Sequence, residues 1–185
     1  PDGRTIKFVV DCGMFQEREH EELNDKLPFD SEEIEFCLVT HNHVDHIGRL
    51  PFMVKNGFCG KIYSTKTTSK YLPISLKDSY KVLRDTSKRR NKKLLYNEEH
   101  VAQTEKLIVP CNYNETIFPA PNIKVKFLSN GHLTGAAMIL VQISYPDYDD
   151  INILFTGDYN NKNIFFEVKK VPEYILDLPI TIEQE

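Results

Sequence analysis

The chain has 185 residues, a length that suits one domain with its own hydrophobic core. Its net charge of −4 argues against a protein that holds nucleic acid through a basic field spread over its whole surface. No run of about 18 apolar residues occurs, so we expect neither a transmembrane helix nor a membrane partner. The four cysteines are scattered and form no CxxC pair, which favours a reducing, intracellular location over a disulfide framework or a structural zinc site.

The spacing of apolar residues predicts the elements of the first half of the chain. In chain order we expect a strand over 5–10, a charged loop over 14–30, a strand over 34–40, a helix over 47–57, a strand over 60–65 and mostly helix over 66–99.

The second half of the chain carries more strand patterns than helix patterns. We expect a helix over 97–110 that Pro110 ends, strands over 122–130, 136–144 and 152–158, a turn over 145–150, and one last strand in the tail, 172–185. Because some neighbouring strands have helices between them and others do not, the sequence predicts an α/β sandwich with mixed β-sheets.

Four metal-binding side chains crowd directly after the strand predicted over 34–40, in the stretch THNHVDHIG. His41 and His43 are two residues apart in an extended segment, so their side chains lie on one side. Asp45 and His46 follow as the chain turns into a helix, and they therefore point in a different direction. Imidazole and carboxylate groups are common zinc ligands in catalytic sites, so this loop predicts metal binding by two sets of residues.

Three further strand ends carry an aspartate or a histidine. Asp11 follows the first predicted strand, His132 lies in the small-residue segment NGHLTGAA, and Asp158 follows Gly157 in LFTGD. Each residue taken alone is equally typical of a turn. Together with the histidine loop, they predict a convergent polar site built from several strand ends.

These motifs resemble the metallo-β-lactamase superfamily, whose HxHxDH motif stands here as THNHVDH. More narrowly, the chain resembles the β-CASP branch, the RNA-processing nucleases related to the endonuclease of cleavage and polyadenylation specificity factor and to bacterial ribonuclease J. The segments VVDCGMFQE, THNHVDHIGRLP, NGHLTGAAM and LFTGDYNN carry this resemblance, which covers the chain from about Thr5 to its end.

The resemblance implies a metallo-β-lactamase-like αββα sandwich, two zinc ions and a set of ligands. His41, His43 and His132 would hold one zinc, and Asp45, His46 and Asp158 the second, with Asp158 bridging the two ions. The catalytic residues would be Asp45, Asp158 and Asp11, the last by orienting the metal-binding loop through hydrogen bonds. Such a pair of metals activates a water to the hydroxide that attacks phosphorus.

The resemblance also implies what the protein acts on and where it works. The substrate would be single-stranded RNA, cut internally and also from the 5′ end, and the protein would act as a homodimer or as a subunit of an RNA-processing complex. Its location would be cytoplasmic, or nuclear in a eukaryote. Members of the branch continue past the motif that would begin at Glu183 into a β-CASP domain and a later histidine for the second metal. Residues 1–185 would thus be a partial metallo-β-lactamase domain with fewer than two tightly held zinc ions, and we expect this part alone to be inactive.

Several alternatives stay open at the level of sequence. The chain could be another hydrolase of the superfamily, for example a thioester or lactone hydrolase or a DNA-repair nuclease, or it could be a scaffold subunit without activity. Lys88, Arg89 and Arg90 are candidates for contact with RNA phosphate. A solvated helix face explains the same stretch and is favoured, because no aromatic residues interleave with the basic ones.

Overall fold

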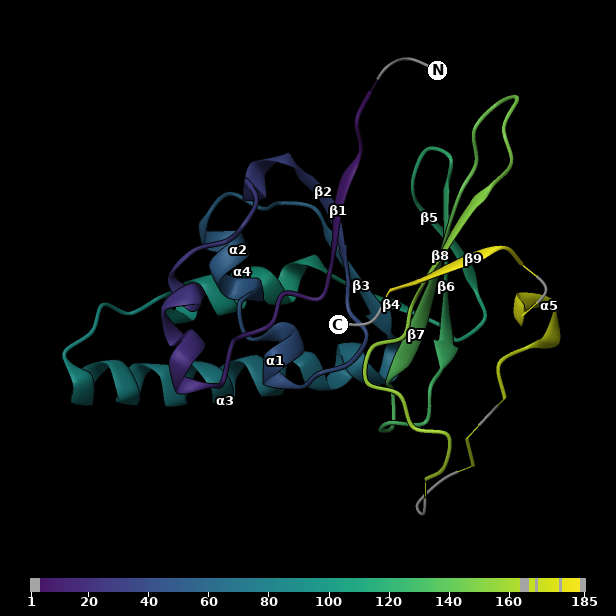
Figure 1. Cartoon of the computed structure of the whole chain (residues 1–185). Coiled ribbons are helices and arrows are strands. Elements are labelled where there is room, and N and C mark those ends of the chain that lie inside the picture. Colours follow the sequence, from purple (N-terminus) through teal and green to yellow (C-terminus); the bar gives the residue numbers. More distant parts are fainter. Residues whose placement is uncertain (1–3, 164–166, 169, 177, 184–185) are drawn as a thin grey trace.

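The strands of the computed structural model, which describes residues 4–163, 167–168, 170–176 and 178–183, form two sheets (Figure 1). The first sheet has the order β1-β2-β3-β4, and all of its strands are parallel. They are β1 (Lys7–Val10), β2 (Ile34–Leu38), β3 (Lys61–Thr65) and β4 (Ile108–Cys111). Because parallel neighbours require crossover connections, the chain returns each time through residues outside the sheet.

The second sheet has the order β5-β6-β7-β8-β9. Its strands are β5 (Thr116–Ala120), β6 (Ile123–Ser129), β7 (Ala137–Ile143), β8 (Ile151–Phe155) and β9 (Ile180–Glu183). The pairs β5–β6, β6–β7 and β7–β8 are antiparallel. The last strand, β9, runs parallel to β8 with Glu183 opposite Phe155. The sandwich therefore contains one parallel and one mixed sheet.

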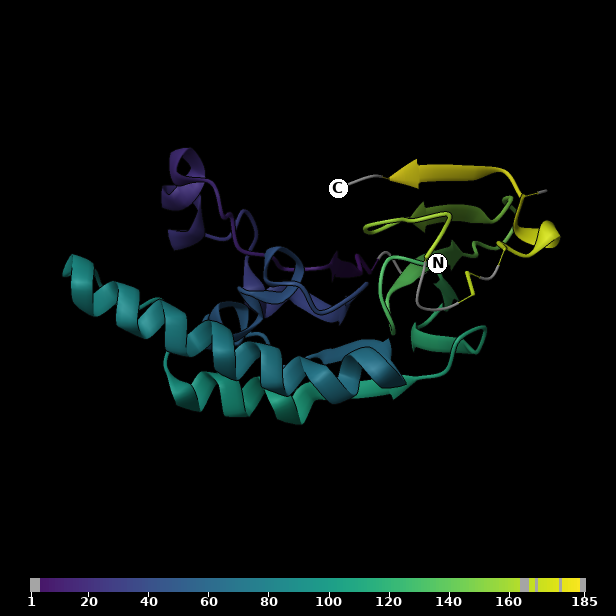
Figure 2. The same cartoon turned by 90° about the horizontal axis from the view of Figure 1, so that it is seen from below.

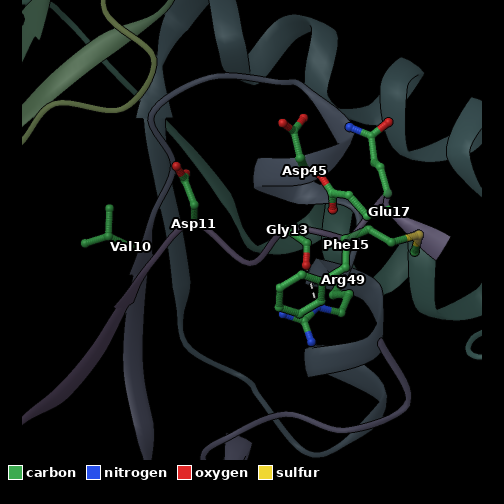
Figure 3. Close-up of a pocket in the computed structure, with 9 residues that line it drawn as sticks. Val10, Asp11, Gly13, Phe15, Glu17, Asp45 and Arg49 are labelled. Carbon is green, nitrogen blue, oxygen red and sulfur yellow. Dashed lines mark hydrogen bonds between the residues drawn. The ribbon is translucent and has the colours of Figure 1, made fainter. Parts of the chain in front are cut away.

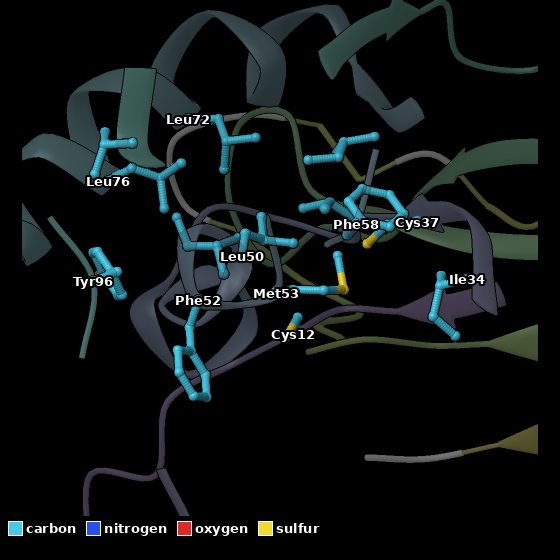
Figure 4. Close-up of a cluster of buried hydrophobic side chains, with 14 of the residues drawn as sticks. Cys12, Ile34, Cys37, Leu50, Phe52, Met53, Phe58, Leu72, Leu76 and Tyr96 are labelled. Atoms are coloured by element: carbon cyan, nitrogen blue, oxygen red, sulfur yellow. The ribbon is translucent and has the colours of Figure 1, made fainter. Parts of the chain in front are cut away.

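Helices cover the outer face of the first sheet (Figures 1 and 2). They are α1 (Val44–Ile47), α2 (Leu50–Lys55), α3 (Lys66–Arg90) and α4 (Glu98–Leu107), and two short 3-10 helices, η1 (Arg18–Asp25) and η2 (Ser31–Glu33), lie in the connection between β1 and β2. A core of buried side chains from β2, α2, β3 and α3, among them Cys37, Met53 and Leu72, fills the space beneath them (Figure 4). This core makes the parallel sheet a firm support for the loops at its edge.

A second core lies between the sheets, and the alternation of side chains along the strands produces it. In β2, Phe36 and Leu38 point toward the other sheet, whereas Cys37 points toward the helices. In β7, Ile139 points inward, whereas Leu140 packs on the outer face with Ile175 of α5 (Glu173–Leu176). Successive side chains of a strand leave opposite faces, so each sheet is covered on both sides.

The layers are therefore helices, parallel sheet, mixed sheet and helix, and the α/β sandwich with mixed sheets predicted from sequence is confirmed. In the described part of the chain, no helix combines the length and the apolar character that a membrane crossing needs.

Three of the predicted helices differ from the observed ones. The helix expected over 47–57 is shorter and is observed as α2 (Leu50–Lys55), while the separate short helix α1 ends at Ile47, because the chain bends at Gly48 and Arg49. The helical stretch expected over 66–99 ends at Arg90, where Asn91 takes a left-handed conformation. The helix expected over 97–110 ends at Leu107, and the strand β4 follows it directly.

Candidate metal centre

The polar residues singled out in the sequence follow strands whose carboxyl ends lie at the same end of the sandwich. Asp11 follows β1 and His41 follows β2 in the first sheet, while His132 follows β6 and Asp158 follows β8 in the second. A backbone hydrogen bond from Ala137 N to Thr40 O, 2.9 Å long, joins the two sheets at this end. The site is therefore assembled from both sheets.

Four side chains offer ligand atoms that all lie within 4.8 Å of one another: His41, His43, His132 and Asp158. Nδ1 of His43 lies 3.0 Å from Nε2 of His41 and 3.3 Å from Nε2 of His132. Tetrahedral zinc holds nitrogen at about 2.0–2.1 Å, which places its ligand atoms roughly 3.3 Å apart. The spacing and the chemistry of this donor set therefore fit a single metal ion.

Asp158 lies between this group and a second set of residues. Its Oδ2 is 3.3 Å from Nε2 of His132, and its Oδ1 is 3.3 Å from Nε2 of His46. Asp45 also belongs to the second set, with Oδ2 3.9 Å from Nε2 of His46. The carboxylate of Asp158 thus faces both sets of residues.

The surroundings of the histidines keep them in the form that binds metal. Burial and the neighbouring histidines lower the pKa of His41 to about 2. The pKa of His132 is also lowered, mainly by burial and against the pull of Asp158. A neutral imidazole has a free nitrogen lone pair, so both rings are ready to coordinate metal at neutral pH.

Asp11 lies behind the ligands and accepts hydrogen bonds from the loop that carries them. Its Oδ1 accepts from the backbone N–H of Thr40 at 2.8 Å, and its Oδ2 contacts the Thr40 hydroxyl at 2.5 Å and Nδ1 of His46 at 2.7 Å. Its φ of 56° turns the chain away from the sheet directly after β1. Aspartate tolerates this left-handed conformation better than most residues.

Two residues of the site were missed by sequence reasoning. The buried side chain of Asn130 accepts from His132 N at 3.2 Å and donates to the carbonyl oxygens of Thr156 and Asp158 at 3.2 and 2.8 Å, so it ties together two of the loops. Thr40 is the second, and its side chain contacts both Asp11 and His41. The position of each residue next to a predicted ligand loop was the only sequence signal that could have drawn attention to it.

The loop after Asp11 packs against the loop that carries the histidines. A Cβ added at Gly13 would lie 1.4 Å from the carbonyl oxygen of Asp45, so only glycine allows this approach. Arg49 holds the loop by donating to the carbonyl oxygens of Gly13, Leu23 and Lys26.

A cavity of about 240 Å³ lies beside the second set of residues, and Asp11 and Asp45 line it together with Phe15 and Arg49 (Figure 3). The side chains of Asp45 and Asp158 are 47% and 43% exposed, so a ligand from solvent can reach both carboxylates.

The basic candidates Lys88, Arg89 and Arg90 lie in the last turn of α3. The first turn of that helix borders the metal centre, because Thr68 donates to Gly135 O at 2.9 Å. The histidine loop also contacts the middle of α3, where Asn42 donates to the Ser75 hydroxyl at 3.2 Å. Arg90 lies 15 residues beyond Ser75, roughly 22 Å along the helix, so the three basic residues are not among the side chains that meet at the metal centre. Arg90 instead pairs with Glu21 at 2.6 Å.

Comparisons with known proteins were made for both the sequence and the fold. A family model described as the metallo-beta-lactamase superfamily matches residues 2–172. The chain is 29% identical to a protein named Ribonuclease TTHA0252 from Thermus thermophilus, over 86% of this chain and 33% of that protein. It is also 29% identical to cleavage and polyadenylation specificity factor subunit 3-II from Arabidopsis thaliana, over 83% of this chain and 25% of the relative.

Among solved structures, the Rm3 metallo-beta-lactamase has the same fold, with a TM-score of 0.55 at 15% identity, over 95% of this chain and 66% of that one. The resemblance to RNA-processing members of the superfamily, predicted from the motifs, is confirmed by the named sequence relatives. The chain spans about a quarter to a third of the length of those two relatives.

Proposed function

Because the chain belongs to the metallo-beta-lactamase superfamily, we propose that it is a zinc-dependent hydrolase that cleaves the phosphodiester bonds of single-stranded RNA. The observation that carries the proposal is the position of Asp158, whose two carboxylate oxygens face different histidines at 3.3 Å. The RNA substrate is proposed because relatives of this chain are named as a ribonuclease and as a subunit of a cleavage and polyadenylation factor.

Each residue of the site has a part in the proposed reaction. His41, His43 and His132 would hold one zinc ion, Asp45 and His46 would hold the other, and Asp158 would contribute to both. Zinc at these positions would supply Lewis-acid activation of a water and would neutralise charge on the phosphate. Asp11 orients the ligands through its hydrogen bonds to Thr40 and His46.

The exposed side of the site would admit the substrate. Asp45 lines the cavity shown in Figure 3, on the side of the centre that solvent reaches. A phosphodiester suits such a centre because it is anionic and because its cleavage needs a strong nucleophile. The proposal includes action as a homodimer or within an RNA-processing complex, in the cytoplasm or, in a eukaryote, in the nucleus.

The proposal is tested by RNA cleavage with and without metal. We expect the full-length protein to cut a labelled single-stranded RNA, a metal chelator to stop the reaction, and added zinc to restore it. Asp158→Asn keeps the shape of the side chain but removes the charge between the two sets of histidines, so it should lower the rate by at least about 100-fold. His20→Gln, an exposed histidine on η1, is the matched control and should leave the rate unchanged.

The products and the substrate panel separate the alternatives. Internal fragments from a 5′-labelled RNA indicate an endonuclease, whereas release of single 5′ nucleotides indicates an exonuclease. A protein that leaves RNA intact but hydrolyses DNA, a thioester or a lactone would be another hydrolase of the superfamily. Equal rates of RNA cleavage by the Asp158→Asn variant and the wild type would contradict the proposed mechanism.

A further inference from the structure

The hydroxyl of Thr40 occupies the space between the carboxylate of Asp11 and the ring of His41. Its Oγ1 lies 2.5 Å from Oδ2 of Asp11 and 3.0 Å from Nδ1 of His41. Thr40 is fully buried, so these contacts are not exchanged for water. The residue therefore connects a carboxylate that holds the loop to an imidazole that faces the metal centre.

The number of protons fixes the direction of each hydrogen bond. An ionised carboxylate can only accept, and a hydroxyl has a single proton to donate. The proton of Thr40 therefore goes to Asp11, and the oxygen of Thr40 is left as an acceptor for an N–H of His41. His41 must then carry its proton on Nδ1, which leaves the lone pair of Nε2 free to coordinate metal.

His46 contacts the carboxylate of Asp11 directly, with no residue between them. Its Nδ1 lies 2.7 Å from Oδ2 of Asp11, so it donates there directly, and its Nε2 faces Asp158. Asp11 thus sets the tautomer of a histidine in each of the two sets, directly for His46 and through Thr40 for His41. Without the hydroxyl of Thr40, these contacts would fix only one of the two rings.

We propose that Thr40 is a positioning residue whose hydroxyl relays the charge of Asp11 to His41 and holds that ring in the tautomer that binds metal. The inference rests on the proposed metal-dependent function, since it assigns a role in the same site. A purely structural role is the competing explanation. Thr40 also packs against Gly157, where an added Cβ would lie 2.8 Å from the Cβ of Thr40, so its bulk alone could support the loop before Asp158.

A pair of variants distinguishes the effect of the Thr40 hydroxyl from the effect of its side-chain volume. Thr40→Val keeps the branched shape and removes the hydroxyl, whereas Thr40→Ser keeps the hydroxyl and removes the methyl group. Zinc affinity of the 185-residue chain, measured by competition with a chromophoric chelator, should fall 10- to 100-fold in Thr40→Val, the effect expected on losing an indirect partner of a ligand. Thr40→Ser should bind zinc within a few-fold of the wild type.

A second measurement reads the tautomer itself. Nitrogen-15 spectra of the histidine rings in metal-free wild-type protein should place the proton of His41 on Nδ1, and Thr40→Val should yield a mixture of tautomers. A wild-type His41 with its proton on Nε2 would overturn the proposal even if Thr40→Val failed to fold. Equal loss of zinc affinity in Thr40→Ser and Thr40→Val would also overturn it, in favour of packing.

The two proposals can fail separately. If the wild-type protein binds no zinc, the proposed function fails, while the spectra of the metal-free protein still decide whether Thr40 controls the ring of His41.

Discussion

At the scale of single residues, His41 is a histidine that the fold holds in its neutral form, with one ring proton. Its ring is fully buried and other histidines surround it, so burial and repulsion both oppose a positive charge there. Its pKa is lowered from 6.5 to about 2 in the folded protein. In the unfolded chain His41 takes up a second ring proton below the ordinary pKa of histidine, whereas in the folded protein it does so only near pH 2. The stability of the metal-free protein therefore depends on pH.

The sign of this dependence is set by which state takes up the proton. Above pH 6.5 neither state binds it, and the lowered pKa has no effect on the free energy of unfolding. As the pH falls from 6.5 toward 2, only the unfolded state binds the proton, so the free energy of unfolding should fall by about 1.4 kcal/mol per pH unit from this residue. Denaturant unfolding at a series of pH values, with a chelator present, measures the slope.

The variant His41→Gln removes the titrating group and should lower this slope by one proton. Identical slopes for His41→Gln and the wild type would show that His41 does not titrate as described.

Residue types explain which parts of the site could be read from the sequence. Histidines in a cluster and aspartates at strand ends are few and bear distinctive chemistry, so His41, His43, Asp45, His46, His132 and Asp158 could be selected. Thr40 and Asn130 could not, because threonine and asparagine occur in turns for many reasons. Their roles depend on contacts with distant segments, which only the fold brings together.

At the scale of elements, α3 is a long helix that buries a narrow stripe. Thr68, Leu72 and Leu76 are spaced by four residues and lie buried, whereas Ile74 is 63% exposed. Residues four apart lie on one face of a helix, so a single row of side chains anchors the first half of α3 to the core in Figure 4.

Removing one side chain of that row should cost more than removing an exposed one. Leu72→Ala should lower the free energy of unfolding by about 2–5 kcal/mol, because it leaves a cavity in the core. Ile74→Ala, a control on the same helix, should change it by less than about 0.5 kcal/mol. Urea denaturation of the two variants measures the difference, and similar losses for both would contradict the packing described for α3.

The two strands that sequence patterns missed, β4 and β5, each contain a proline and lie at the edge of their sheet. Pro110 was interpreted as a helix terminator, but at an edge a strand has no second neighbour that needs its N–H. Central strands such as β2 and β7 are rich in apolar residues and were predicted correctly. The edge strands β1 and β9 contain no proline and were predicted, so proline rather than the edge position itself concealed β4 and β5.

At the scale of the whole molecule, the distribution of cysteines offers a probe of global unfolding. Cys59 is exposed, whereas Cys12, Cys37 and Cys111 are buried in the cores. Burial raises the pKa of Cys12 to about 12 and that of Cys111 to about 11, which suppresses their reactive thiolate forms.

A thiol reagent should therefore label one cysteine of the four rapidly in the native protein, and the other three only as the molecule unfolds. Cys59→Ser should remove the rapid phase and leave the slow one, as a spectrophotometric thiol assay with and without denaturant can record. Rapid labelling of two or more cysteines would mean that the cores open more easily than the burial of these side chains implies.

The seam between the two sheets gives metal binding a consequence beyond chemistry. The ligands follow β2 in one sheet and β6 and β8 in the other, so an ion held among them would act as a cross-link between segments that only the folded chain brings together. A ligand that binds only the folded state stabilises it by about 1.4 kcal/mol for each tenfold excess over its dissociation constant. The amount of free metal in the surroundings would then set how firmly the two halves of the sandwich stay together.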